Sequence, residues 1–230
     1  MLKPGKKITR KELKRDPLME FVYRARQSWL EYRSVLSRYA GLVLVVVALA
    51  VLVIRWRGGQ NEKAAAAVGI AFIEFAQGNY HTVIAQLNGS VEEYSGLKSF
   101  GNGLFLLARS ELMVGDTTGA ERHFRRYIDD YGKDRLITAG ALAGLGIIIE
   151  GRRGYQEAAE LYLRASKLAP TAGIEQRYAV FAGRGFILAD QPQDALKVLK
   201  PLLEAGGLDF RTKSEIQGLV ASAEAIAPGS

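Results

Sequence analysis

The apolar positions of the chain are concentrated in residues 40–54, a block of 15 residues without a charged side chain, eleven of which are Leu, Val or Ile. Tyr39 and Trp56 can extend a helix over the block to 18 residues, or about 27 Å, close to the thickness of a hydrocarbon core. Arg38 and Arg55 can snorkel to the headgroups. The aliphatic side chains favour insertion by about 3 to 7 kcal/mol. The pattern therefore predicts a transmembrane helix over residues 39–57.

Two other interpretations of the block fit less well. A core helix normally has a polar face, and this block has none. A cleaved signal peptide has a short charged region before it and a small-residue cleavage site after it. Here a long basic segment precedes the block, and Arg55-Trp56-Arg57 follows it. We therefore expect an uncleaved signal anchor.

After the block, the pattern changes to helices with one apolar face, separated by turns at regular intervals. The predicted turns are Gly78-Asn79-Tyr80, Gly115-Asp116-Thr117, Arg153-Gly154-Tyr155 and Asp190-Gln191-Pro192. A small or apolar residue follows each turn (Val83, Ala120, Ala158, Ala195), at spacings of 37, 38 and 37. Such a period predicts a solenoid of about four helical hairpins over residues 64–227, in which 209–227 form a capping helix. Residues 58–63, which contain Gly58-Gly59, are expected to form a flexible linker.

The third repeat is the clearest and consists of Leu142, Leu145-Gly146, Ile149, Tyr155, Ala158, Tyr162, Ala165 and Pro170. This pattern of residue types and spacings resembles the tetratricopeptide repeat (TPR), and the other three repeats match that pattern more weakly. The period departs from the usual 34 residues, which implies longer helices or loops. The resemblance implies an all-α fold, in which a single transmembrane helix is followed by a TPR-like α-solenoid.

In such arrays the first helices line the concave groove. On that register the groove residues are Phe72, Phe75, Phe105, Arg109, Met113, Ile147, Arg184 and Ile187. They would form an apolar trough with two cations, suited to an extended or helical peptide.

The segment before the block, residues 1–38, reads as an amphipathic arm. Thr9 and Glu12 can form a capping box, and Asp16-Pro17 opens a second helix. That helix has an apolar stripe at three- or four-residue spacing: Leu18, Phe21, Ala25, Trp29, Tyr32 and Leu36. The stripe fits a helix in the membrane interface, a helix docked on a partner membrane protein, or a helix that only leads into the span. The residues expected to dock on the membrane or a partner are Phe21, Trp29, Tyr32, Leu36, Arg38, Arg55 and Trp56.

Charge sets the expected orientation. The arm holds 11 Lys/Arg and 4 Asp/Glu, an excess that equals the net charge of the whole chain, +7. The positive-inside rule places the arm in the cytoplasm and the repeats on the other side of the membrane. Basic residues beside a span indicate attraction to anionic lipid, and we expect no nucleic-acid binding.

The sequence lacks the residues that most enzymes use. There is no Cys, and the only two histidines, His81 and His123, have no carboxylate at metal-ligand spacing. No nucleophile elbow, zinc-protease motif or phosphate loop is present. Gly144, Gly146, Gly183 and Gly185 are better explained by close helix packing than by a nucleotide loop. We expect no catalytic residue, no cofactor and no metal.

The layout also resembles the bacterial YfgM-like proteins, ancillary subunits of the Sec translocon, over roughly residues 39–225. They have a cytoplasmic N-terminus, one span followed by Trp/Arg, and a periplasmic array of degenerate TPR hairpins. The resemblance implies a non-enzymatic adaptor that binds polypeptides or chaperones beside an inner-membrane machine such as the translocon. A second interpretation is a structural subunit of another membrane complex, held by the arm and the span. A third is a peripheral cytoplasmic scaffold whose apolar block is a core helix.

Overall fold

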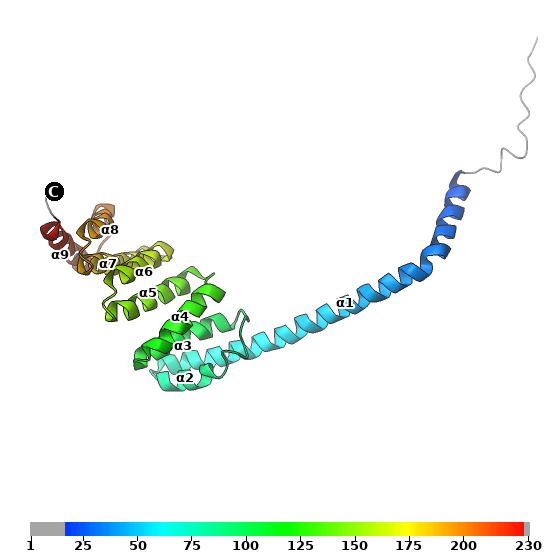
Figure 1. Cartoon of the computed structure of the whole chain (residues 1–230), viewed down its shortest axis with the longest axis horizontal. Coiled ribbons are helices and arrows are strands. Elements are labelled where there is room, and N and C mark those ends of the chain that lie inside the picture. The colour runs from blue at the N-terminus through cyan, green and yellow to red at the C-terminus, as the bar shows by residue number, and fades with distance from the viewer. Residues whose placement is uncertain (1–16, 228–230) are drawn as a thin grey trace, which may run out of the picture. The chain divides into compact units, whose positions relative to one another are not determined.

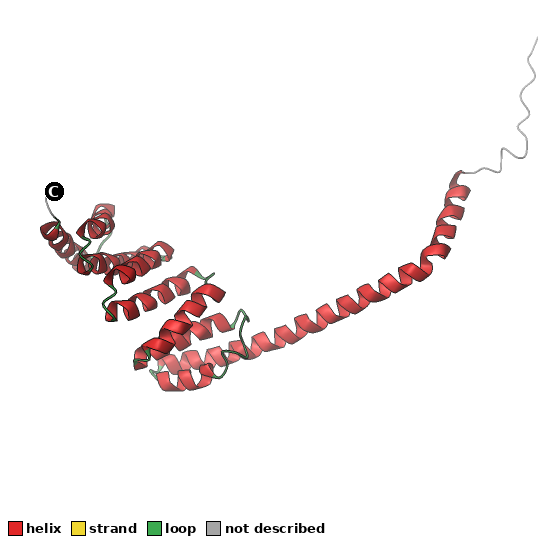
Figure 2. Cartoon of the chain, viewed as in Figure 1, coloured by secondary structure: helices red, strands yellow, loops and turns green. Residues whose placement is uncertain are grey.

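The computed structural model describes residues 17–227, and in this range every regular element is an α-helix (Figures 1 and 2). The helices are α1 (Pro17–Ala76), α2 (Tyr80–Asn88), α3 (Phe100–Val114), α4 (Thr117–Tyr131), α5 (Arg135–Gly151), α6 (Tyr155–Leu168), α7 (Ala172–Leu188), α8 (Pro192–Ala205) and α9 (Phe210–Ile226). The all-α prediction is confirmed. The predicted capping box at Thr9 and Glu12 lies outside the described residues.

The chain divides into two compact units, Met1–Trp56 and Arg57–Ser230. Residues 58–63, where the sequence predicts a flexible linker, are helical as part of α1. The expected flexible linker at residues 58–63 is therefore replaced by continuous helix. Two glycines cost a helix about 1 kcal/mol each, but helix propagation is cooperative, and the strong helix formers of Ala64-Ala65-Ala66-Ala67 follow directly.

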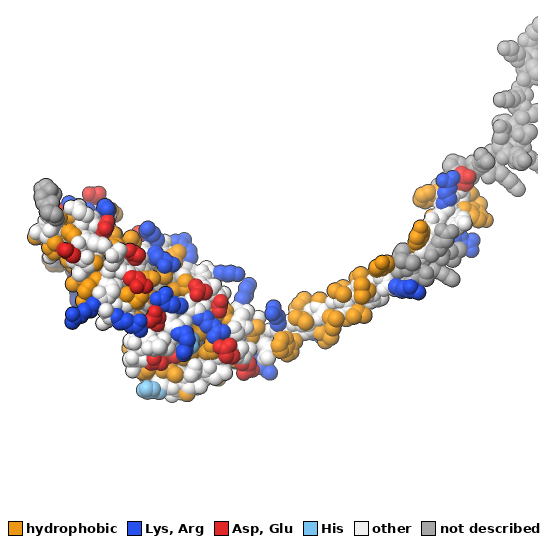
Figure 3. All heavy atoms as spheres, viewed as in Figure 1, with side chains coloured by type: hydrophobic (Ala, Val, Ile, Leu, Met, Phe, Trp, Pro, Cys, Tyr) orange, Lys and Arg blue, Asp and Glu red, His pale blue; other side chains and the backbone are white. Residues whose placement is uncertain are grey.

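In the first unit, the apolar block is exposed along its length. Leu44 and Ile54 are each 69% exposed, and Figure 3 shows hydrophobic side chains covering this stretch of α1. Within the described residues, one helix segment is long and apolar enough to cross a membrane, Ser37–Ala76, and none of its most apolar window is buried. An exposed apolar helix of this length is compatible with a single membrane span.

The second unit is an array of helical hairpins, made by the end of α1 with α2, then α3 with α4, α5 with α6, and α7 with α8. Neighbouring helices pack in sequence order, and α9 covers α8 and the adjacent part of α7. This arrangement confirms the predicted solenoid and its capping helix.

All four predicted turns lie between the two helices of a hairpin. Each contains one residue with a left-handed backbone: Gly78, Gly115, Arg153 and Asp190 (φ 83°, 87°, 65° and 57°). In each turn the next backbone N–H donates to the carbonyl five residues back, as from Asp116 to Glu111 at 2.9 Å. This closes the first helix with a Schellman bond.

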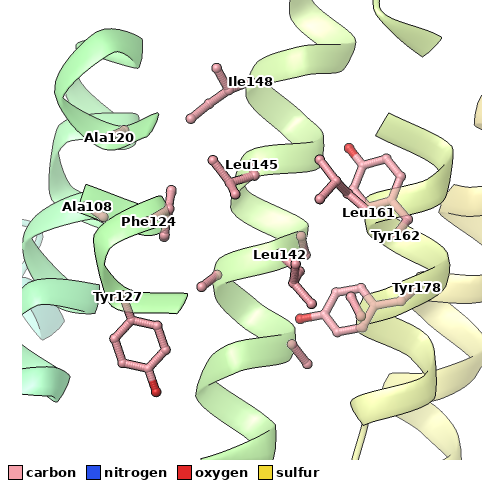
Figure 4. Close-up of a cluster of buried hydrophobic side chains, with 14 of the residues drawn as sticks. Ala108, Ala120, Phe124, Tyr127, Leu142, Leu145, Ile148, Leu161, Tyr162 and Tyr178 are labelled. Atoms are coloured by element: carbon pink, nitrogen blue, oxygen red, sulfur yellow. The ribbon is translucent and has the colours of Figure 1, made fainter. Parts of the chain in front are cut away.

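In each repeat a small buried residue of the first helix precedes a large buried residue of the second helix by 16 positions. The pairs are Ala71–Leu87, Ala108–Phe124, Gly146–Tyr162 and Gly183–Leu199. All eight are buried, and Figure 4 shows Ala108, Phe124 and Tyr162 among the core side chains. The residues after the turns, Val83, Ala120, Ala158 and Ala195, are fully buried too. The small residue lets the helices of a hairpin approach closely.

The packing role expected of the helical glycines is confirmed. A Cβ on Gly146 would lie 2.6 Å from the Tyr162 ring, and one on Gly183 would lie 2.5 Å from Leu199, both within a hairpin. The other two glycines sit between successive hairpins: Gly144 faces Phe124 at 2.5 Å and Gly185 faces Ala159 at 2.9 Å. No side chain fits at these positions without a shift of its neighbour.

An ion-pair group links α4 to the end of α5. The Glu121 carboxylate accepts hydrogen bonds from Arg125 at 2.9 Å and from Arg152 at 2.6 Å. These two bonds, the Arg125 bond first, lower the pKa of Glu121 below its ordinary value. A lowered carboxyl pKa contributes stability above the ordinary pKa, and this contribution is lost as the pH falls through the lower, folded value.

Glu121→Gln is therefore expected to lower the free energy of unfolding by about 0.5–1 kcal/mol at pH 7, because the pair is partly solvent-exposed, and to have little effect near pH 3. Chemical denaturation of the full chain at both pH values measures the difference. Glu215→Gln is the control, since Glu215 is an exposed carboxylate on α9. An equal loss at both pH values would contradict an electrostatic origin.

Candidate binding groove

The first helices of the hairpins border a groove made of two adjoining pockets. One, of about 570 Å³, lies between the end of α1, α3 and the start of α5. The other, of about 530 Å³, lies between α3, α5 and the start of α7. Phe105, Arg109 and Ile137 line both pockets. We call the two pockets together the groove.

Six of the eight residues predicted for the groove line it. Phe72, Phe75, Phe105 and Arg109 line the first pocket. Phe105, Arg109, Met113 and Ile147 line the second. These residues come from three different helices, so the structure brings together positions as far apart as Phe72 and Ile147.

Arg184 and Ile187 line neither pocket. The Arg184 guanidinium lies 3.6 Å from the Glu150 carboxylate and over the Phe181 ring. Ile187 is half-buried against the core. The α7 residues that do line the groove are Arg177, Tyr178 and Phe181. These three residues come before the predicted positions in α7. The groove runs along the last turns of α1 but along the first half of α7, because successive repeats of a solenoid are rotated relative to one another.

The groove walls are apolar and open to solvent. Phe72 is 64% exposed, Met113 57% and Ile147 49%. Exposed apolar side chains gathered in a concave surface are typical of an interaction site.

Arginine supplies the positive charge of the groove. The Arg109 guanidinium lies over the ring of Phe75, 4.8 Å from its centroid, and 5.8 Å from that of Phe105. The Arg177 guanidinium lies 5.4 Å from the Tyr178 centroid. Neither arginine has an ion pair within the part of the chain that the structure describes, and no Asp or Glu lines either pocket. The groove therefore combines apolar walls with uncompensated positive charge.

The two histidines lie away from the groove. His81 is exposed on α2. His123 is buried, and its Nδ1 lies 2.7 Å from the equally buried Glu111 carboxylate. Sequence analysis missed this partner because the two residues are 12 positions apart and meet only when α3 and α4 pack. A pair sealed from solvent cannot reach a substrate, so its role is structural. Among the described residues, no group of three potential ligands could hold a metal ion.

The residues expected to dock on the membrane or a partner lie on the first unit. Phe21 is 70% exposed, Trp29 66%, Tyr32 58% and Trp56 67%, and Arg38 and Arg55 are exposed. The side chain of Leu36 is outside the described residues. These aromatic side chains are exposed within the described part of the first unit, as a helix that meets lipid or another protein requires.

Neither a protein-family model nor a curated protein matches this sequence. Its fold is similar to crystal structures of a Podosopora anserina protein described as a kinesin light chain with nearly identical TPR-like repeats. For one structure the TM-score is 0.54 at 15% identity, covering 72% of this chain and 95% of that chain. For a single-residue variant it is 0.56 at 15% identity, covering 72% and 87%. The likeness shows a TPR-like repeat fold.

Proposed function

We propose that this protein is a non-enzymatic, membrane-anchored adaptor whose groove binds polypeptides or chaperones beside an inner-membrane machine such as the Sec translocon. The observation that carries the proposal is the groove itself, with exposed apolar walls and arginines that no carboxylate of residues 17–227, as described, neutralises. Solenoids of helical hairpins bind their partners through such concave surfaces.

The exposed block at residues 39–57 supports a single membrane span. In the proposed orientation, the basic arm lies in the cytoplasm and residues 64–227 lie in the periplasm. An anchored groove needs little intrinsic affinity, because confinement to the membrane raises the effective concentration of partners there. The YfgM-like layout supports the translocon as the neighbouring machine, and the basic arm supports contact with anionic lipid.

A second candidate is a structural subunit of another membrane complex. The exposed aromatic residues Phe21, Trp29 and Tyr32 favour it, because they could bind a partner helix through the arm alone. The two functions differ in stoichiometry. A subunit is recovered with one complex at a fixed ratio, whereas an adaptor is recovered with many clients at low ratios.

Affinity purification of the full chain from native membranes in mild detergent, with quantitative mass spectrometry, separates the two functions. Translocon subunits and periplasmic chaperones are the result expected for the adaptor. A single stoichiometric complex of another kind would replace the adaptor by the subunit and direct attention to the arm.

Groove variants test the role of the apolar walls. Phe72→Ala, Met113→Ala and Ile147→Ala together are expected to reduce client recovery about tenfold or more, because the three truncations combined are expected to remove at least about 1.4 kcal/mol of binding free energy. Stability should change little, since all three side chains are about half exposed or more. Phe105 is unsuitable for this test because its ring also packs on Phe124 and Tyr127.

The matched control is Ile70→Ala, Ile73→Ala and Leu188→Ala, three apolar residues of similar exposure that line neither pocket. Equal recovery of clients with the groove and control variants would show that binding occurs elsewhere.

A further inference from the structure

Arg109 stands on the wall shared by the two pockets of the groove. It lines the pocket bordered by Phe72 and Phe75, and it lines the pocket bordered by Met113 and Ile147. Any chain that fills both pockets must therefore pass this guanidinium.

The Arg109 guanidinium lies over the rings of Phe75 and Phe105, 4.8 and 5.8 Å from their centroids, and these cation–π contacts occupy none of its N–H donors. The N–H donors of a guanidinium lie in its plane, so they remain available to a partner. No hydrogen bond or ion pair from Arg109 occurs within residues 17–227 as described. A bound carboxylate would be a bidentate match for these donors.

The charge around the groove is a local feature. The chain beyond residue 38 has equal numbers of basic and acidic residues, yet its acidic side chains in ion pairs, such as Glu121 and Glu92, lie elsewhere. Even Arg184, next to the groove, is neutralised by Glu150. Among the described residues, no carboxylate pairs with Arg109 or Arg177, so a bound partner is the source of negative charge that this surface fits.

We propose, on the basis of the adaptor function above, that the groove binds a peptide segment in which a carboxylate side chain lies between two large apolar side chains. The apolar side chains occupy the two pockets and the carboxylate pairs with Arg109. A second carboxylate further along the segment reaches Arg177. Basic segments are rejected, because they would place like charges together in a partly desolvated groove.

The test uses the full chain in phosphatidylcholine nanodiscs, where the lipid carries no net charge. Each fluorescein-labelled peptide contains one Phe and one Leu between flanks of Gly and Ser. The two apolar residues are separated either by the single residue X or by Gly-X-Gly, and X is Asp, Asn or Lys. Fluorescence anisotropy gives each Kd. The Asp peptide is expected to bind about fivefold more tightly than the Asn peptide, and the Lys peptide least tightly. Raising the salt concentration from about 0.05 to about 0.5 M should reduce the difference in Kd between the Asp and Asn peptides.

Arg109→Gln is expected to remove the preference for Asp while leaving the Kd of the Asn peptide within about twofold. The control is Arg164→Gln, an exposed arginine of α6 that lines neither pocket. If Arg109→Gln fails to fold, the salt dependence of the Asp preference in the unmodified chain still tests the inference.

Equal binding of the Asp and Asn peptides at both spacings and at low salt would overturn this inference and leave the adaptor function standing. Failure of all the peptides to bind would overturn both. A preference for Asp that survives in a folded Arg109→Gln variant would overturn the assignment to Arg109.

Discussion

Gly146→Ala is expected to lower the free energy of unfolding by about 2 kcal/mol, even though alanine is the better helix former. The gain in helix propensity is about 1 kcal/mol. Overpacking of this buried site is expected to destabilise the fold by about 3 kcal/mol. The new Cβ would lie 2.6 Å from one Tyr162 ring carbon and 2.9 Å from two more. The ring cannot move away easily because it packs on Phe181 from α7. Chemical denaturation of the full chain in detergent measures the loss.

The other repeats supply the rescue and the control. Tyr162→Leu in the Gly146→Ala background recreates the Ala71–Leu87 pair of the first repeat. It should recover at least about 1 kcal/mol relative to the sum of the single variants, as expected for residues in contact. Gly218→Ala places a Cβ in open space on α9 and should be neutral or stabilising. If Gly146→Ala behaved like Gly218→Ala, the close-packing account of the hairpins would be wrong.

Val46→Arg combined with Val47→Arg is expected to release the protein from the membrane. Each arginine at the centre of a span opposes insertion by about 2.5–3.5 kcal/mol, and each valine lost removes about 0.3–0.6 kcal/mol. The total of about 6–8 kcal/mol exceeds or cancels the roughly 3 to 7 kcal/mol with which the aliphatic side chains of the block favour insertion. Extraction of native membranes at alkaline pH measures the change, because integral proteins stay with the membrane.

Val46→Leu with Val47→Leu is the control and should stay with the membrane, since leucine inserts as well as valine. Release of the unmodified chain by alkaline extraction would contradict the membrane span and support a peripheral scaffold. Retention of the arginine variant would show that residues other than the block hold the protein at the membrane.

The sequence determines the repeat elements because local chemistry decides them. The four turns carry residues that tolerate a left-handed backbone, such as Gly115 and Asp190. Asp116, Asp134 and Asp209 accept a backbone N–H three residues on and so begin α4, α5 and α9, as N-cap residues do. The apolar period then predicts which face of each helix is buried, and residues such as Ala158 and Ala195 lie in the core as expected.

Part of the groove was predictable from the same period. Phe72 and Ile147 lie on the exposed side of first helices, Phe105 lies partly buried beside them, and the repeat register alone places the three near one another. The error in α7 has a different origin. The rotation between successive hairpins depends on how whole helices pack, and the sequence period does not specify that angle. Arg177 and Phe181 therefore line the groove in place of Arg184 and Ile187.

By itself, the sequence determined a helical repeat array preceded by one long apolar helix, because turn chemistry and hydrophobic periodicity act over a few residues. Only the tertiary structure decided the burial of Glu111 against His123 and the course of the groove along α1, α3, α5 and α7. These features depend on contacts between residues far apart in the chain, and such contacts follow from the packing of whole helices rather than from any local preference.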